Sequence, residues 1–298
     1  MTVAWKSQGE RGSRFAIRLM VWLALVMGRP VARALLYPIC VYYLSRSRQA
    51  NDALRNFYRH ACGRPVTWGG LFHHYYWFAS TILDRLYFLR GQVDRFNIQL
   101  HGLEVLDRAL AKGRGCLLLG SHLGSFEVVR AIGLSRDHTE VRVLMDEGNA
   151  PMMRELSQAL NPAVAAAVIQ VGGAETMLHV KECVDRGGVV GIMGDRLMAE
   201  DRSVPCRFLG EAAPFPTGTM RLAHATQTPV VMFFGLYRGG SRYDVYLELL
   251  SESVQLTSDD RQDEITRWTQ RYADRLAQYS RDTPDNWFNF YDFWGSSH

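Results

Sequence analysis

Residues 115–127 read GCLLLGSHLGSFE. The first six residues form a short, continuous apolar run, which is typical of a strand buried on both faces of a parallel sheet. Ser125 can cap a helix over 125–134 that follows directly. A buried strand that leads straight into a helix is the first half of a βαβ unit, so this segment indicates an α/β fold.

The alternation of strand and helix continues on both sides of this segment. We expect further strands at 97–100, 141–145, 168–171, 188–194, 230–235 and 242–250. Helices are expected at 66–90, 103–112, 151–160, 174–186, 218–227 and 261–281. No regular element is assigned between residues 197 and 217. The pattern predicts an α/β fold in which helices flank a mostly parallel central sheet.

The first 60 residues are basic and contain two apolar runs. They hold ten Lys and Arg against two acidic residues, although the whole chain has a net charge of only +4. The runs at 15–27 and 31–45 are each shorter than the ~20 apolar residues that a membrane-spanning helix needs. Arg14 and Arg18 lie beside an apolar stripe, a pattern that favours a helix in the membrane interface. A buried helix pair and a true span are the alternatives.

This basic N-terminal pattern sets the expected organisation of the chain. We expect an N-terminal helical, membrane-associating region over residues 1–92 and an α/β domain over residues 93–298, joined in one continuous fold. The arginines predict an anionic partner, such as a membrane surface or an acidic protein. Nucleic acid is the least expected partner, because the chain has only three lysines and its arginines lie among apolar residues.

Composition limits the class of protein. The chain has 298 residues, of which 47% are hydrophobic and 21% charged, so it is too apolar and too weakly charged for a disordered protein. A mean hydropathy of −0.13 excludes a protein with many membrane spans. Five scattered cysteines, without a CxxC pair or metal-ligand spacing, predict reduced thiols in a cytosolic compartment.

The first candidate site follows the strand at 115–120. In open α/β sheets, ligands bind beyond the carboxyl ends of the strands, and His122 lies in the turn at such an end. Glu127 follows on the first turn of the next helix, where its carboxylate can accept a hydrogen bond from Nδ1–H of His122. That bond would fix the tautomer and leave Nε2 to take a proton from a substrate hydroxyl. A buried structural histidine is the alternative reading.

A second strand end carries Asp195 and Arg196, directly after the strand at 188–194. This pair can bind a phosphate or orient the first site, and it can also be a surface ion pair of little energetic weight. Other nucleophile and phosphate motifs are not present. Gly120-Ser121-His122-Leu123-Gly124 is not a GxSxG elbow because its serine comes one place early, and the sequence has neither GxxxxGK[ST] nor GxGxxG after a strand.

The spacing from His122 to Glu127 is an H-x4-D/E motif, and the chain around it resembles the lysophospholipid acyltransferase superfamily. The closer similarity is to its bacterial branch of lipid A late acyltransferases, of lauroyl or myristoyl type. The resemblance runs from about residue 15 to residue 294. It rests on further segments that follow in the family's order: Asn149-Ala-Pro151, Gly194-Asp195-Arg196, Val204–Gly210, Phe215–Ala223 with its Thr-Gly-Thr, and the Pro284-x-x-Trp287 tail.

The resemblance implies an acyltransferase that moves a fatty acyl group from a thioester of acyl carrier protein or coenzyme A to a hydroxyl or amine of a membrane lipid. His122 would be the general base, oriented by Glu127, and no cofactor or metal beyond the acyl thioester is implied. The implied substrate-binding residues are Asn149, Asp195, Arg196, Thr217, Gly218 and Thr219, with backbone N–H groups near the last three as candidates for the oxyanion site. The implied location is the cytoplasmic face of the bacterial inner membrane, with the chain peripheral or shallowly inserted.

One departure from the family's pattern concerns the acceptor. An arginine usually precedes the N-x-P segment, whereas this chain has Met145-Asp146-Glu147 there. The change predicts weaker binding of a phosphorylated sugar, so the acceptor lipid is left open. A thioesterase or lipid hydrolase that uses the same pair, and a non-catalytic membrane-binding protein of the same fold, are the alternative functions.

Overall fold

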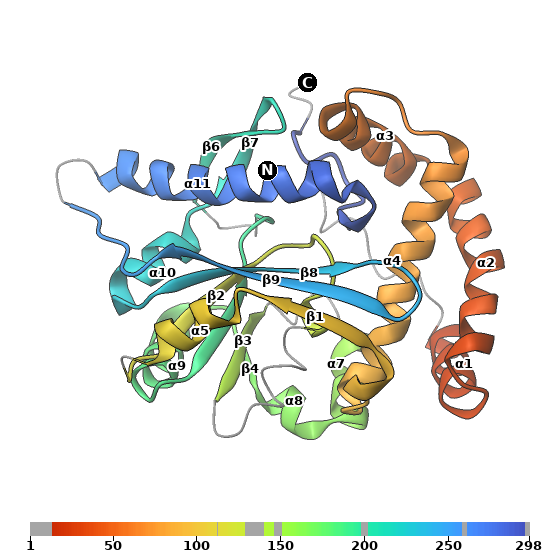
Figure 1. Ribbon diagram of the computed structural model, residues 1–298, viewed down its shortest axis with the longest axis horizontal. Coiled ribbons are helices and arrows are strands. Elements are labelled where there is room, and N and C mark those ends of the chain that lie inside the picture. The colour runs from red at the N-terminus through yellow and green to blue at the C-terminus, as the bar shows by residue number, and fades with distance from the viewer. Residues whose placement is uncertain are drawn as a thin grey trace.

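The computed structural model describes residues 14–111, 113–128, 140–145, 151–197, 202–257 and 261–295. Its centre is a seven-stranded sheet with the order β1-β9-β8-β2-β5-β3-β4 (Figure 1). The strands are β1 Asn97–His101, β2 Cys116–Gly120, β3 Val141–Met145, β4 Val168–Gln170, β5 Val189–Met193, β8 Val230–Tyr237 and β9 Arg242–Ser251. Neighbouring strands run parallel except β8 and β9, which are antiparallel. The predicted α/β fold with a mostly parallel central sheet is confirmed.

Helices precede the sheet, alternate with its strands and follow it. The α-helices are α1 Arg14–Val26, α2 Arg29–Arg46, α3 Arg48–Cys62, α4 Trp68–Leu89, α5 Leu103–Leu110, α7 Pro151–Leu160, α8 Pro162–Ala166, α9 Gly173–Asp185, α10 Gly218–Thr226 and α11 Arg261–Asp282, with short 3-10 turns η1 Val93–Arg95 and η3 Pro284–Asn286. The predicted helix at 66–90 is α4, and Thr67 caps it by accepting a hydrogen bond from the backbone N–H of Gly70 at 3.1 Å.

The two faces of the sheet are covered by different helices. α11 lies on one side and α5 on the other (Figure 1). Successive residues of β2 point to opposite faces, so Leu117 packs in the cluster that contains Tyr272 of α11, and Leu118 packs in the cluster that contains Ala109 of α5. All five residues of β2 are buried, as the continuous apolar run predicts.

A second, two-stranded sheet occupies the region to which the sequence assigned no element. β6 Ser203–Phe208 and β7 Glu211–Pro216 form an antiparallel hairpin, in which Pro205 lies opposite Pro214. Proline is uncommon inside strands because it lacks a backbone donor, and it hides the alternation of buried and exposed residues in β6. The turn residues Leu209 and Gly210 both have positive φ, 52° and 100°, as the tightest hairpin turns require.

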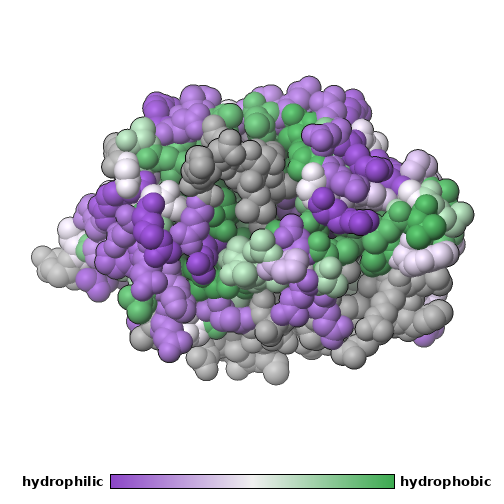
Figure 2. All heavy atoms as spheres, turned by 90° about the horizontal axis from the view of Figure 1, so that it is seen from below, coloured by the Kyte–Doolittle hydropathy of each residue, from purple (hydrophilic) through white to green (hydrophobic). Residues whose placement is uncertain are grey.

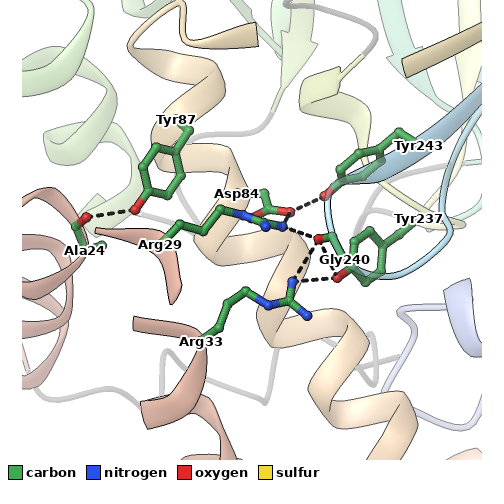
Figure 3. A network of polar contacts seen from close by, with 8 residues as sticks. All are labelled: Ala24, Arg29, Arg33, Asp84, Tyr87, Tyr237, Gly240 and Tyr243. Carbon is green, nitrogen blue, oxygen red and sulfur yellow. Dashed lines mark hydrogen bonds and ion pairs between the residues drawn. The ribbon is translucent and has the colours of Figure 1, made fainter. Parts of the chain in front are cut away.

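Polar contacts fasten α2 and α4 to the β8–β9 turn (Figure 3). Arg29 of α2 donates two hydrogen bonds to the Asp84 carboxylate of α4, at 2.6 and 2.8 Å, and Tyr243 of β9 donates a third at 2.8 Å. Arg33 donates to the hydroxyl of Tyr237 at 2.6 Å. The first helices therefore pack on the sheet itself, while the predicted domain boundary near residue 92 stays a prediction.

No helix in the described ranges combines the length and the apolar character that crossing a bilayer would require. The predicted membrane-associating role of the N-terminal helices is taken up below as part of the proposed function.

Candidate active site

The site is built where two parallel strands end side by side. β2 and β5 are neighbours in the sheet, and their last residues, Gly120 and Met193, are paired in register. The chain therefore emerges from both strands at the same edge. Two residues beyond each strand end lie His122 and Asp195, and the Nδ1 atom of His122 is 2.9 Å from Oδ1 of Asp195. The backbone N–H of His122 also donates to Oδ2 of Asp195 at 2.9 Å.

The turn that carries His122 is fixed by close backbone contacts. Gly124 has a φ of 82°, and a Cβ there would lie 2.2 Å from the carbonyl oxygen of Gly235 in β8. Only glycine fits this approach, which lets the backbone N–H of Ser125 donate to the same carbonyl at 2.7 Å. On the other side, the hydroxyl of Tyr272 in α11 donates to the carbonyl oxygen of Gly120 at 2.7 Å. The imidazole is thus presented from a rigid support.

Burial, helped by Arg196, favours a neutral imidazole at His122. Burial raises the pKa of Asp195, but His122 and Arg196 outweigh it and bring the pKa to about 2. Burial lowers the pKa of His122, the nearby Arg196 lowers it further, and Asp195 opposes them only in part. Nδ1 therefore carries the proton and donates it to Asp195, which leaves the lone pair of Nε2 free to accept a proton. The His122 side chain is 28% exposed, so part of the imidazole is in contact with solvent.

The sequence analysis predicted the wrong hydrogen-bond partner for Nδ1 of His122. The sequence analysis gave this hydrogen bond to Glu127, whereas the structure gives it to Asp195. Glu127 is buried and forms an ion pair with Arg85 of α4 at 2.8 Å. Glu127 is close to His122 along the chain, but Asp195 is brought to it by the pairing of β2 with β5, which the sequence does not display. The alternative in which Asp195 supports the histidine fits this geometry, and a catalytic role for Glu127 stays a prediction.

Arg196 is turned toward the C-terminal segment. Its Nε donates to Oδ1 of Asn289 at 2.7 Å, its Nη2 donates to the carbonyl oxygen of Phe288 at 3.1 Å, and its guanidinium lies 5.8 Å from the ring centre of Tyr291. Nδ2 of Asn289 donates to Oδ2 of Asp195 at 3.1 Å. Sequence reasoning missed Asn289. The available signal was the Pro284-x-x-Trp287 tail, because Asn289 follows two residues after Trp287.

The other predicted binding residues are not joined to this pair by the contacts that the structure describes. The backbone N–H and the hydroxyl of Thr217 both donate to the carbonyl oxygen of Arg202, at 2.9 and 3.0 Å. Thr217 and Thr219 are buried, and Gly218 between them begins α10 and is exposed. Their substrate-binding role stays a prediction. Asn149 lies outside the described residues.

A metal site and a general base place different requirements on the described residues. They contain no group of three or more His, Cys, Asp or Glu that could hold a metal ion. What they do provide is a histidine base with its tautomer fixed by a buried carboxylate, which suits proton removal from an attacking hydroxyl or water.

Comparison with known families defines the class of protein. Residues 80–295, well over half of the chain, match the family of bacterial lipid A biosynthesis acyltransferases. The chain therefore belongs to this family and is an acyltransferase, which confirms the resemblance drawn from its motifs. A search among individually curated proteins gave no match. The family's reaction is acyl transfer to a lipid, and the matched segment contains both His122 and Asp195.

Proposed function

We propose that this protein transfers a fatty acyl group from an acyl thioester, carried by acyl carrier protein or coenzyme A, to a hydroxyl or amine of a membrane lipid. The observation that carries the proposal is the imidazole of His122, whose Nδ1 is 2.9 Å from Oδ1 of Asp195 at the carboxyl end of the sheet. Its pKa lies below the ordinary value of 6.5, so it is a neutral base at physiological pH.

The proposed reaction needs one base and no acyl-enzyme. Nε2 of His122 takes the proton of the acceptor hydroxyl while its oxygen forms a bond to the thioester carbonyl carbon. The carbon–sulfur bond then breaks, and the imidazolium returns the proton to the departing sulfur, which leaves as a thiol. Asp195 stabilises the imidazolium between these two transfers. A thioester is already activated, so holding both substrates in place supplies much of the remaining rate.

Glu127 fits this scheme as a positioning residue. Its ion pair with Arg85 ties the helix that follows His122 to α4. Both side chains are largely buried, so losing the attraction between them would be costly, and the pair holds the turn against α4. Glu127 thus acts on the imidazole through the shape of the turn, in place of the direct hydrogen bond that the sequence suggested.

A membrane surface is the proposed location, on the cytoplasmic face of the bacterial inner membrane. Large apolar side chains of α1, α2 and the turn between them are exposed to solvent: Trp22, Val26, Met27, Val31, Tyr37, Val41 and Tyr42. In Figure 2, hydrophobic residues gather at the end of the molecule where α1 and α2 lie in Figure 1. Exposed aromatic and aliphatic side chains suit contact with a lipid surface, and the exposed Arg46 and Arg48 at the junction of α2 and α3 can meet anionic headgroups or an acidic carrier protein.

The test is an acyl-transfer assay with purified protein, an acyl thioester of carrier protein or coenzyme A, and vesicles of bacterial lipid extract. We expect acyl-lipid to form, and His122→Ala to reduce the rate at least ~10²-fold. His179→Ala is the matched control, because His179 is exposed on α9. Near-normal transfer by His122→Ala would remove the assignment. Thioester loss at full rate without lipid would favour a thioesterase, and no thioester consumption would favour a binding protein.

The acceptor is identified by lipid mass spectrometry of cells with and without the gene. We expect one lipid class to lose an acyl chain in the cells that lack it. Retention of lipid A acylation in those cells would match the loss of the arginine before the N-x-P segment.

A further inference from the structure

The segment that lies against His122 follows α11 in the chain. We call residues 284–294 the C-terminal strap. The backbone N–H of Phe288 donates to the carbonyl oxygen of His122 at 2.8 Å, and Leu123 pairs with Trp287 as an antiparallel bridge. The strap is therefore hydrogen-bonded to the backbone of the residue that carries the base.

One side chain of the strap reaches past the backbone to the carboxylate. Asn289 is 1% exposed, and both ends of its amide are used. Nδ2 donates to Asp195 at 3.1 Å, and Oδ1 accepts from Arg196 at 2.7 Å. A carboxylate can only accept and a guanidinium can only donate, so the orientation of the amide is fixed by its neighbours. The amide of Asn289 thus connects the carboxylate of Asp195 to the guanidinium of Arg196 and adds no charge of its own.

The amide completes the set of donors around Asp195. Oδ1 faces Nδ1 of His122, and Oδ2 receives the backbone N–H of His122 and Nδ2 of Asn289. A carboxylate held by several donors cannot rotate away from the imidazole, and partners of this kind commonly govern the activity of the group that they orient.

We propose that Asn289 is a positioning residue for the proposed base: its amide holds the Asp195 carboxylate against His122 and keeps Arg196 beside it. The proposal rests on the proposed function, because it gives the strap a part in the same acyl transfer. It goes beyond that function by making the acid–base behaviour of His122 depend on a side chain 167 residues further along the chain.

The groups that act on His122 are few in the described structure. Asp195 and Arg196 face it from the loop after β5. Two tyrosines are the next titratable groups. Burial, with a smaller contribution from Asp195, raises the pKa of Tyr272 in α11, and burial raises the pKa of Tyr291 in the strap. Both tyrosines are therefore neutral at physiological pH, so a charge introduced at position 289 acts mainly on Arg196, Asp195 and His122.

The chain supplies a matched control in the same strap. Asn286 is also fully buried, and its amide also makes two hydrogen bonds, but both go to the backbone of Tyr237 in β8, at 2.8 and 3.2 Å. Replacing Asn286 removes a buried amide of the same kind without touching Asp195. A purely structural role of Asn289 predicts equal effects of the two substitutions.

The test measures the pKa of His122 by NMR and the kinetics of acyl transfer for Asn289→Asp, Asn289→Leu and Asn286→Leu. In Asn289→Asp the new carboxylate neutralises Arg196, so we expect the pKa of His122 to rise by about one unit. In Asn289→Leu we expect kcat to fall ~10-fold or more with little change in KM. Asn286→Leu is expected to lower stability while the pKa of His122 stays at the wild-type value.

An unchanged pKa in folded Asn289→Asp, or an equal fall of kcat in Asn286→Leu, would overturn the proposal. If Asn289→Asp does not fold, the wild-type protein provides the test. We expect the side-chain amide resonance of Asn289 to shift as His122 titrates. A resonance that does not shift would overturn the proposal. The NMR titration needs no substrate, so it separates this inference from a failure of the proposed acyl transfer.

Discussion

Asp84 and Asp195 are both buried carboxylates, 0% and 1% exposed, yet the protein surrounds them differently. Asp84 is held by Arg29, whose charge is permanent, and by the hydroxyl of Tyr243. Burial raises its pKa and these partners offset that effect only in part. Asp195 is held by an imidazole, an amide and a backbone N–H, and its pKa falls to about 2 despite equal burial.

The difference separates a structural ion pair from the pair that we propose for catalysis. Around Asp84 every partner keeps its protons, so the network can only fasten α2 and α4 to the sheet (Figure 3). Around Asp195 one partner, His122, is an imidazole, which can accept a proton and give it up again. A buried carboxylate is therefore informative about function only when the group that it binds can titrate.

The largest expected effect is that of Asp195→Asn. The amide keeps the shape but can donate to Nδ1, which would reverse the tautomer and place the proton on Nε2. We expect kcat for acyl transfer to fall by ~10³–10⁴ while the protein stays folded. Single-turnover kinetics and circular dichroism measure the two quantities. A loss below tenfold would show that Asp195 does not orient the base.

For Asp84→Ala the loss should appear in stability. The substitution leaves the guanidinium of Arg29, only 14% exposed, without its carboxylate. We expect the free energy of unfolding to fall by ~3–5 kcal/mol, measured by urea denaturation. The double variant Arg29→Met with Asp84→Leu should recover much of this loss. A fall in kcat per folded molecule, with unchanged stability, would erase the contrast between the two aspartates.

A smaller effect is expected for Glu127→Gln. The amide keeps the size and one acceptor but removes the charge opposite Arg85. We expect kcat to fall by ~10-fold, since the turn that carries His122 becomes less rigid. The same assay as for Asp195→Asn gives the comparison. Equal losses in the two variants would return Glu127 to the role of direct orienting group.

The pH dependence of the wild-type reaction tests the contrast between Asp84 and Asp195 without any substitution. His122 must be neutral to accept a proton, and its pKa lies below 6.5 because burial and Arg196 disfavour the imidazolium. We expect kcat/KM to be constant near neutral pH and to fall as the pH drops through a midpoint below 6.5. A midpoint above 6.5 would mean that Asp195 outweighs burial and Arg196.

Local sequence patterns predicted the elements that form the sheet. The apolar runs of β2 and β5 were readable because strands buried on both faces carry few polar residues. The hairpin of β6 and β7 was not, since Pro205 and Pro214 hide its alternation. The positive φ that Leu209 adopts in its turn also has no clear sign in the sequence.

The sequence predicted the positions of individual site residues but not the contacts between residues that are far apart in the chain. His122 was found from its place at a strand end, and Asp195 in the same way. That these two residues meet depends on the order of strands in the sheet, which local patterns do not contain. The contact of Asn289 with Asp195 depends on the path of the strap after α11, a tertiary property of the same kind.

The strap also has a consequence for the order in which the site is completed during synthesis of the chain. Ribosomes deliver a chain from its amino end, so His122 and Asp195 are made well before Phe288 and Asn289, which hold them. A nascent chain can therefore fold most of its sheet while the proposed site is still incomplete. The proposed site should therefore become complete only once the strap has been synthesised and has packed against His122 and Asp195.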